Sequence, residues 1–202
     1  MADNCGVFVI LVFPISNYQR FKNAMMKNRS ILLNYTGSLV CSAPETRTIE
    51  GNWPGNRTIA ILHFTSEISA RSYLQSDPVV KQPDFMDGVD VCIVPLNALP
   101  PTGKEFFVIA DVQVHDPEKF LNEYSPKTSE MKAKGEVVVT AASTNLISYR
   151  GSWKPSMLII NQWPDEASYH TFYNSDAYQP LKELRRRITR STVVTLRNEL
   201  TN

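Results

Sequence analysis

The chain has little that would place it in a membrane, on a nucleic acid or outside the cell. Its most prominent apolar run, Val7–Phe13, is far shorter than the roughly 20 residues that cross a bilayer, and no basic segment precedes it as in a secretion signal. The 21 basic and 20 acidic side chains leave a formal charge of +1, so no net field attracts nucleic acid or anionic lipid. We therefore expect a soluble, cytoplasmic protein without a nucleic-acid or membrane partner.

Cysteine and the short motifs of cofactor and metal sites are also scarce. The three cysteines, Cys5, Cys41 and Cys92, all lie in the first half of the chain and lack metal-ligand spacing. An odd number without counterparts in the second half argues against a disulfide framework. Glycine-rich phosphate loops, Gly-x-Ser-x-Gly, Cys-x-x-Cys and His-Glu-x-x-His are missing. The sequence predicts free thiols, no metal and no tightly bound cofactor.

What the chain does contain is an internal repeat. The segment GNWPGNRTIAILHFTSEISARSYLQSD (51–77) is echoed by GSWKPSMLIINQWPDEASYHTFYNSD (151–176), and the offset of roughly 100 residues also holds for the segments on both sides. A constant offset of this size indicates two copies of one fold. We predict a first repeat at 5–97, a linker at 98–103 that contains Pro100-Pro101, and a second repeat at 104–198.

Each repeat shows the order β-α-β-β-α-β, which is typical of a ferredoxin-like unit. The apolar trio of the first helix, Phe21, Met25 and Leu32, has counterparts in Phe120, Tyr124 and Met131 when the repeats are overlaid. Such a unit covers one face of its sheet with helices and leaves the other face bare. We predict an α+β protein in which two tandem ferredoxin-like βαββαβ units pack through these faces as an intramolecular pseudo-dimeric α/β barrel. Further oligomerisation stays open.

Local signals mark the ends of the first helix in each repeat. Asp116-Pro117 predicts an N-cap and a first-turn proline for the second repeat, and Pro126 predicts a kink in that helix. Gly37 and Gly135 follow the helices where a left-handed terminator is expected.

Residues of the second repeat carry a resemblance to a known family. This repeat resembles the domain of unknown function 1330 family of the dimeric α/β-barrel superfamily, through Asp116, Pro117, Gly151, Trp153, Gln162, Trp163, Ala167, Phe172, Tyr173, Ser175, Tyr178 and Arg185. The first repeat is a weaker match, with Pro78-Val79-Val80 opposite Tyr178 and no arginine opposite Arg185. The resemblance implies fold and pairing, because the family has no settled activity. Its superfamily relatives include cofactor-free monooxygenases, haem-degrading enzymes, lactone isomerases and small-molecule sensors, which use the cavity between sheet and helices.

Four residues that match the family pattern form the candidate substrate-binding site: Tyr178, Arg185, Trp153 and Gln162. A phenol, a planar cation, an indole and an amide around an apolar cavity could orient an aromatic molecule that bears a carboxylate or enolate. The cavity is expected between the sheet and the helical region 165–187. The alternative is that these side chains fill a core and bond to backbone groups.

Histidines and a basic run are weaker candidates. His63, His115 and His170 could act as general bases, but none has a histidine at its counterpart position, and a turn or surface role is favoured. The basic run between Lys182 and Arg190 is typical of a solvated helix end. No catalytic residue is assigned.

Two functions remain open from the sequence. The first is a protein that binds or transforms a small anionic or aromatic metabolite in the second repeat without a metal. The second is a non-enzymatic interaction or scaffold protein in which both cavities are filled. Whether the protein is an enzyme is left undecided.

Overall fold

The computed structural model describes residues 5–76 and 88–199, which form two antiparallel five-stranded sheets. The first sheet has the strand order β2-β4-β1-β5-β8 and the second has the order β3-β10-β6-β9-β7. The strands of the first sheet are β1 (Val7–Pro14), β2 (Gly37–Ser42), β4 (Arg57–Phe64), β5 (Asp90–Pro95) and β8 (Ile147–Arg150). Those of the second sheet are β3 (Arg47–Glu50), β6 (Phe106–Val114), β7 (Val138–Ser143), β9 (Leu158–Trp163) and β10 (Thr189–Arg197).

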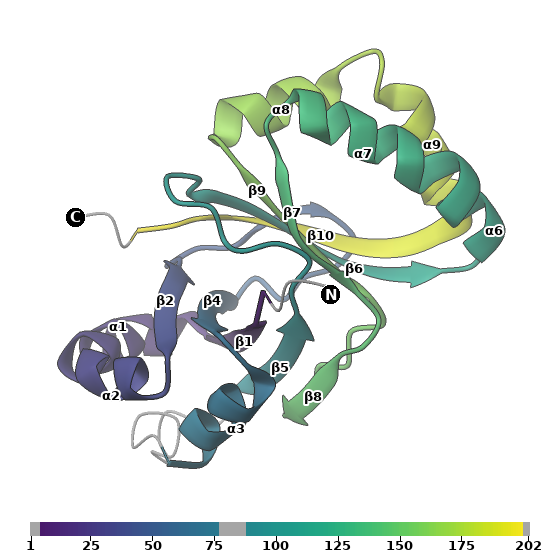
Figure 1. Cartoon of the computed structure of the whole chain (residues 1–202). Helices are drawn as coiled ribbons and strands as arrows, with labels where there is room; N and C mark the ends of the chain where they lie inside the picture. Colours follow the sequence, from purple (N-terminus) through teal and green to yellow (C-terminus); the bar gives the residue numbers. More distant parts are fainter. Residues whose placement is uncertain (1–4, 77–87, 200–202) are drawn as a thin grey trace.

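Each sheet carries its helices on the outer face, as Figure 1 shows. The helices of the first repeat are α1 (Tyr18–Lys27), α2 (Arg29–Asn34) and α3 (Glu67–Ser76), with a 3-10 turn at Ile15–Asn17. Those of the second are α6 (Pro117–Lys119), α7 (Ser125–Lys134), α8 (Glu166–Asn174) and α9 (Gln179–Ile188), with a π-helical turn at Phe120–Tyr124. Among the residues described, no helix is both long and apolar enough to cross a lipid bilayer.

The inner faces of the two sheets pack against each other. Alternate residues of β1 divide between two cores: Phe8 and Ile10 join an inter-sheet cluster with Ile109 and Ile160 of the second sheet, whereas Val9 and Leu11 face the helices of the first repeat. The period of two sends neighbouring side chains to opposite faces. The α+β class and the face-to-face packing of two ferredoxin-like units are therefore confirmed.

The repeats also exchange strands, which the sequence did not predict. Strand β3 belongs to the first repeat but pairs with β10 of the second sheet, and β8 of the second repeat pairs with β5 of the first. Neither segment is among the six elements predicted for each repeat, because four residues are too few to show a clear alternation. Each exchanged strand covers what would otherwise be an unpaired sheet edge.

The Gly-x-Trp motif follows each exchanged strand and has a structural role. The backbone at Gly51 and Gly151 adopts φ of 76° and 88°, a conformation that residues with a side chain rarely adopt. A Cβ on Gly151 would lie 2.0 Å from Oδ1 of Asp90, so glycine is also required for space. The turns bring Trp53 and Trp153 together edge to face, with ring centroids 6.1 Å apart.

Some of the predicted helix signals are confirmed and others are wrong. The Asp116 side chain accepts a hydrogen bond from the Lys119 amide at the start of α6, as predicted. Gly37 and Gly135 are not left-handed; Thr36 (φ 57°) and Glu136 (φ 56°) take that conformation instead. A Cβ on Gly37 would lie 2.5 Å from Leu32 Cδ1, so packing requires that glycine. At the predicted kink site, the helix has its π turn, Phe120–Tyr124, just before Pro126, which lacks an N–H.

Candidate functional site

A cavity lies between the second sheet and the helices of the second repeat, where the sequence predicted it. Its free volume is about 60 Å³. On β9, Ile159, Asn161 and Trp163 face it, because every second side chain of the strand points to the helices. The cavity is lined by Val108, Ala110, Val112, Phe120, Tyr124, Lys132, Ile159, Asn161, Trp163, Tyr169, Phe172, Tyr173, Tyr178, Arg185 and Val193.

Arg185 is the buried cation of the cavity. It stands in the last turn of α9, seven residues after Tyr178, so both side chains project from the same helix face. Arg185 is 6% exposed, and its Nη2 donates to Oε1 of Glu50 at 2.7 Å. Burial alone would lower the pKa of Arg185, but Tyr178, Tyr124 and Glu50 outweigh it and raise this pKa.

Glu50 reaches the site from the other repeat. It is the last residue of the exchanged strand β3 and also accepts hydrogen bonds from the Tyr173 hydroxyl and, at 3.2 Å, from Arg186 Nη2. Burial by itself would raise the pKa of Glu50, but the hydrogen bond from Tyr173 and the charge of Arg185 outweigh it and lower this pKa. Glu50 is therefore a carboxylate that holds one edge of the Arg185 guanidinium.

Two tyrosine hydroxyls form a pair inside the cavity. Tyr124 ends the π turn and Tyr178 precedes α9, and their hydroxyl oxygens lie 3.3 Å apart. Burial and then the neighbouring Tyr178 raise the pKa of Tyr124 well above its ordinary value. The Tyr124 phenol is therefore neutral at physiological pH, and either hydroxyl can donate to the other or to a ligand.

Lys132 supplies an amine to the same cavity. It lies eight residues after Tyr124 along one helix face, and its Nζ donates to Oδ1 of Asn161 at 3.1 Å. Burial, followed by the charge of Arg185, lowers the pKa of Lys132 to about 8. No carboxylate in the described parts of the chain lies within salt-bridge distance of this amine.

Three residues that line the cavity each carry a buried donor without an acceptor. Trp163 Nε1, the Tyr169 hydroxyl and Arg185 Nε have no hydrogen-bond partner among residues 5–76 and 88–199. A buried donor without an acceptor costs about 1–3 kcal/mol, so three around one cavity call for an explanation. An indole N–H and a guanidinium N–H can only donate, so the missing group is an acceptor.

The four predicted binding residues do not form one site. Tyr178 and Arg185 line the cavity, but Gln162 and Trp153 do not. Because Asn161 faces the cavity, its neighbour Gln162 faces the other sheet, where its amide nitrogen donates to the Lys104 carbonyl at 3.2 Å. Trp153 lies against Trp53 and packs on the inter-sheet core.

The histidines stand away from the cavity. His63 Nε2 lies 3.0 Å from the Cys5 carbonyl oxygen, and His170 lies 3.6 Å from Glu166 on an exposed helix face. His115 is exposed at the end of β6. In the described ranges, no group of three or more histidine, cysteine or acidic residues could hold a metal ion.

Sequence reasoning missed Glu50, Lys132 and Asn161. Glu50 directly precedes Gly51-x-Trp53, as Arg150 precedes Gly151-x-Trp153, but strand exchange could not be inferred from this position. The signal for Asn161 was available. Asn161 stands opposite the apolar Leu62 when the repeats are overlaid, so a polar side chain had replaced a core residue.

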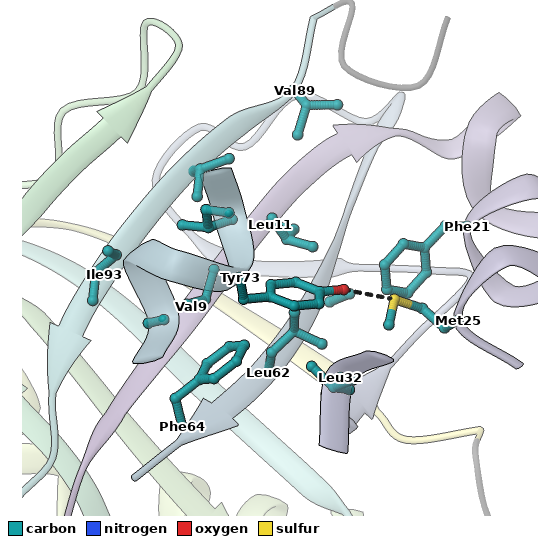
Figure 2. Close-up of a cluster of buried hydrophobic side chains, with 14 of the residues drawn as sticks. Val9, Leu11, Phe21, Met25, Leu32, Leu62, Phe64, Tyr73, Val89 and Ile93 are labelled. Atoms are coloured by element: carbon teal, nitrogen blue, oxygen red, sulfur yellow. Dashed lines mark hydrogen bonds between the residues drawn. The ribbon is translucent and has the colours of Figure 1, made fainter. Parts of the chain in front are cut away.

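The corresponding space in the first repeat is filled by apolar side chains (Figure 2). Met25 occupies the position of Tyr124, and Leu62 that of Asn161. The Tyr73 hydroxyl points to Met25 Sδ at 3.9 Å, while Phe21, Leu32 and Phe64 complete the cluster. Residues 78–80, expected opposite Tyr178, lie outside the described residues.

Comparison with known proteins supports the fold and leaves the activity unassigned. Solved structures with the same fold include an anthrone oxidase-like protein (TM-score 0.52, 10% identity, 96% of this chain and 92% of that chain). A candidate monooxygenase from Lactobacillus acidophilus matches with a TM-score of 0.55 and 14% identity, over 95% of this chain and 93% of that one. A heme-binding protein from Thermus thermophilus matches with a TM-score of 0.50 and 11% identity, over 96% and 91%.

Sequence comparison identifies the second repeat. No curated protein matches the chain in sequence. Residues 105–198 match the family model described as a domain of unknown function (DUF1330), which is the family that the second repeat resembles. The second repeat therefore matches the DUF1330 model, within a chain whose duplicated ferredoxin-like fold is that of the solved structures above.

Proposed function

We propose that the cavity of the second repeat binds a small metabolite that bears a carboxylate. The observation that carries this proposal is the set of three buried donors without an acceptor among the described residues, Trp163 Nε1, Tyr169 hydroxyl and Arg185 Nε, around one cavity. A carboxylate has about four acceptor sites and would satisfy such donors. Charge-assisted hydrogen bonds to arginine are the stronger kind.

The volume of the cavity limits the size of the ligand. A volume of about 60 Å³ accommodates about four to six water-sized groups, at roughly 10–15 Å³ each. Pockets for drug-sized ligands measure about 300–1,000 Å³. The volume therefore favours a small anionic ligand of a few heavy atoms over the aromatic one that the resemblance suggested.

Haem, the ligand of the heme-binding protein from Thermus thermophilus, does not fit this cavity. The volume is several times too small, and none of the three histidines lines it. Lys132, Asn161 and the tyrosines form a polar, hydrogen-bonding wall. The proposed function therefore involves no haem.

Charge also favours an anion. Arg185 and Lys132 line the cavity, and Glu50 accepts a hydrogen bond from Nη2 of the Arg185 guanidinium. The hydrogen bond to Glu50 orients the guanidinium, and Nε is left without an acceptor among the described residues. In this proposal Arg185 binds the carboxylate, Tyr178 donates to a second oxygen of the ligand, and Glu50 is a positioning residue.

The test is a thermal-shift and calorimetric titration with formate, acetate, glyoxylate, pyruvate and lactate. We expect at least one to raise the melting temperature of the wild type, and Arg185→Lys/Tyr178→Phe to lose most of this response. Arg187→Ala removes an exposed arginine from the same helix and is the matched control. If no compound stabilises the wild type, or the double variant responds like Arg187→Ala, the proposal is wrong and a scaffold function gains support.

A further inference from the structure

We propose that Lys132 is a catalytic residue that forms an imine with the carbonyl carbon of a small 2-oxo acid held in the cavity of the second repeat. The inference rests on the proposed binding function and deepens it, because it names the substrate class and a reactive group. Its first support is position. Lys132 Nζ lines the same cavity as Arg185 and the Tyr124–Tyr178 pair. A carboxylate at Arg185 and a carbonyl beside the tyrosines are the two groups that a 2-oxo acid carries on adjacent carbons.

The partner of the amine is the second support. Lys132 bonds to the neutral amide oxygen of Asn161 and to no carboxylate in the described residues. A lysine that served as a structural ion-pair partner would be expected to have an acid beside it. An amide acceptor orients the amine without stabilising its charge as strongly, which suits a nucleophile that must lose a proton.

The surroundings of Lys132 raise the fraction of its amine that is neutral. Burial and the charge of Arg185 lower the pKa of Lys132 to about 8. Near pH 7.5 such a lysine has roughly 200-fold more neutral amine than one with the ordinary pKa. The other titratable groups at the cavity are Tyr124, Tyr169, Tyr173 and Tyr178, with Glu50 behind Arg185.

The chemistry balances without any further reagent. The lone pair of neutral Nζ attacks the carbonyl carbon, and nitrogen gives up one proton, which reaches the carbonyl oxygen through the tyrosine hydroxyl pair. Nitrogen then loses its second proton, which reaches the C–OH oxygen by the same route; the C–O bond breaks, water leaves, and the nitrogen lone pair forms the C=N bond. Amine and carbonyl become imine and water, and nothing is oxidised or reduced.

The two repeats differ at both positions of this pair. Leu33, which is 58% exposed, stands at the position of Lys132 in the first repeat, and the buried Leu62 stands at that of Asn161. The amine and its amide partner therefore occur together, in the repeat that has the polar cavity.

The experiment traps the imine in the full-length protein. Wild type, Lys132→Arg and Lys134→Arg are incubated with glyoxylate or pyruvate and cyanoborohydride, and the adduct is located by intact mass and peptide mapping. Lys134 lies on the same helix but is exposed and paired with Glu130, so Lys134→Arg is the matched control. We expect one adduct on Lys132 in wild type and Lys134→Arg, at least about tenfold more than on any surface lysine. Lys132→Arg should lose it.

The pH dependence adds a signature that a merely structural lysine would lack. Labelling at Lys132 should reach half its maximum near pH 8, whereas labelling of surface lysines should keep rising to about pH 10. Thermal shifts with the same acids separate the two proposals. Binding without labelling of Lys132 overturns the imine and leaves the binding function standing; neither binding nor labelling overturns both.

Discussion

The two repeats share a fold and differ in what fills it. Between its sheet and helices, the first repeat packs Phe21, Met25 and Tyr73 in an apolar cluster. At equivalent positions, the second repeat has a cavity with tyrosines, an amine and a buried arginine. Burial of unpaired polar groups weakens a fold, so the second repeat carries a cost in stability that the first avoids. The difference fits a division in which the first repeat supports the structure and the second contains the proposed site.

The sheets contribute to the site as well as to stability. Strand exchange brings Glu50 of the first repeat to Arg185 of the second, at 2.7 Å. Its counterpart Arg150 is exposed and forms no salt bridge with the described residues. Both repeats therefore exchange a strand, but among the described residues only the strand from the first repeat brings a charged side chain into an ion pair in the other repeat.

The largest effect is expected from separating the repeats. A chain of residues 104–198 lacks β3 and the partner sheet that buries Phe107, Ile109 and Ile160. An exposed apolar face of this size associates or prevents folding. We expect this fragment to dimerise or aggregate in analytical ultracentrifugation and to lose cooperative unfolding. A stable, folded monomer in dilute buffer would show that the repeats do not depend on each other.

A second prediction compares Glu50 with Arg150. Glu50→Ala leaves the buried Arg185 without its carboxylate, which should lower the free energy of unfolding by about 3–5 kcal/mol. Arg150→Ala should change it by about 0.5 kcal/mol or less, as is usual for an exposed side chain. Urea denaturation of the two variants measures both values. If both variants lost the same free energy of unfolding, Glu50 and Arg150 would contribute equally, which contradicts the proposed difference between the two exchanged strands.

A third prediction makes the second cavity resemble the first. In Lys132→Met/Asn161→Leu, the half-buried lysine and its buried partner both become apolar. The pKa of Lys132 is about 8 in the folded state and about 10.4 in the unfolded state, so protonating this amine costs more in the folded protein. The wild type therefore loses stability as pH falls from about 10.4 to about 8, and the loss is complete below pH 8. The variant should be more stable by about 1–3 kcal/mol at neutral pH, and its advantage should shrink as pH rises to about 10. Constant advantage at all pH values would contradict the shifted lysine.

The smallest effect is expected where the repeats are alike. Trp53 and Trp153 contact each other edge to face, so Trp53→Phe and Trp153→Phe should each cost about 1 kcal/mol of stability. Neither should change the response to carboxylates, because neither tryptophan lines the cavity. If Trp153→Phe alone lost the ligand response, Trp153 would belong to the binding site, as the family pattern suggested.

The sequence predicts the fold well because the repeat supplies two independent readings of each element. Phe21 in the first repeat and Phe120 in the second fall on the same face of the first helix, so each repeat supports the helix predicted from the other. The exchanged strands were missed because four residues such as Arg47–Glu50 contain no readable period. Which of two neighbouring polar residues faces the cavity depends on strand register: Gln162 was chosen from the family pattern, but Asn161 has the position.

The most direct test of an anion site in the second repeat follows the Arg185 Nε–H resonance by NMR during titration with glyoxylate. Arg57 Nε is also buried without an acceptor among the described residues, but it lies in the first repeat beside Asp90, and serves as internal control. We predict a saturable shift of the Arg185 resonance and none for Arg57. If Arg185 does not respond, or if both resonances move together, the cavity of the second repeat is not an anion site.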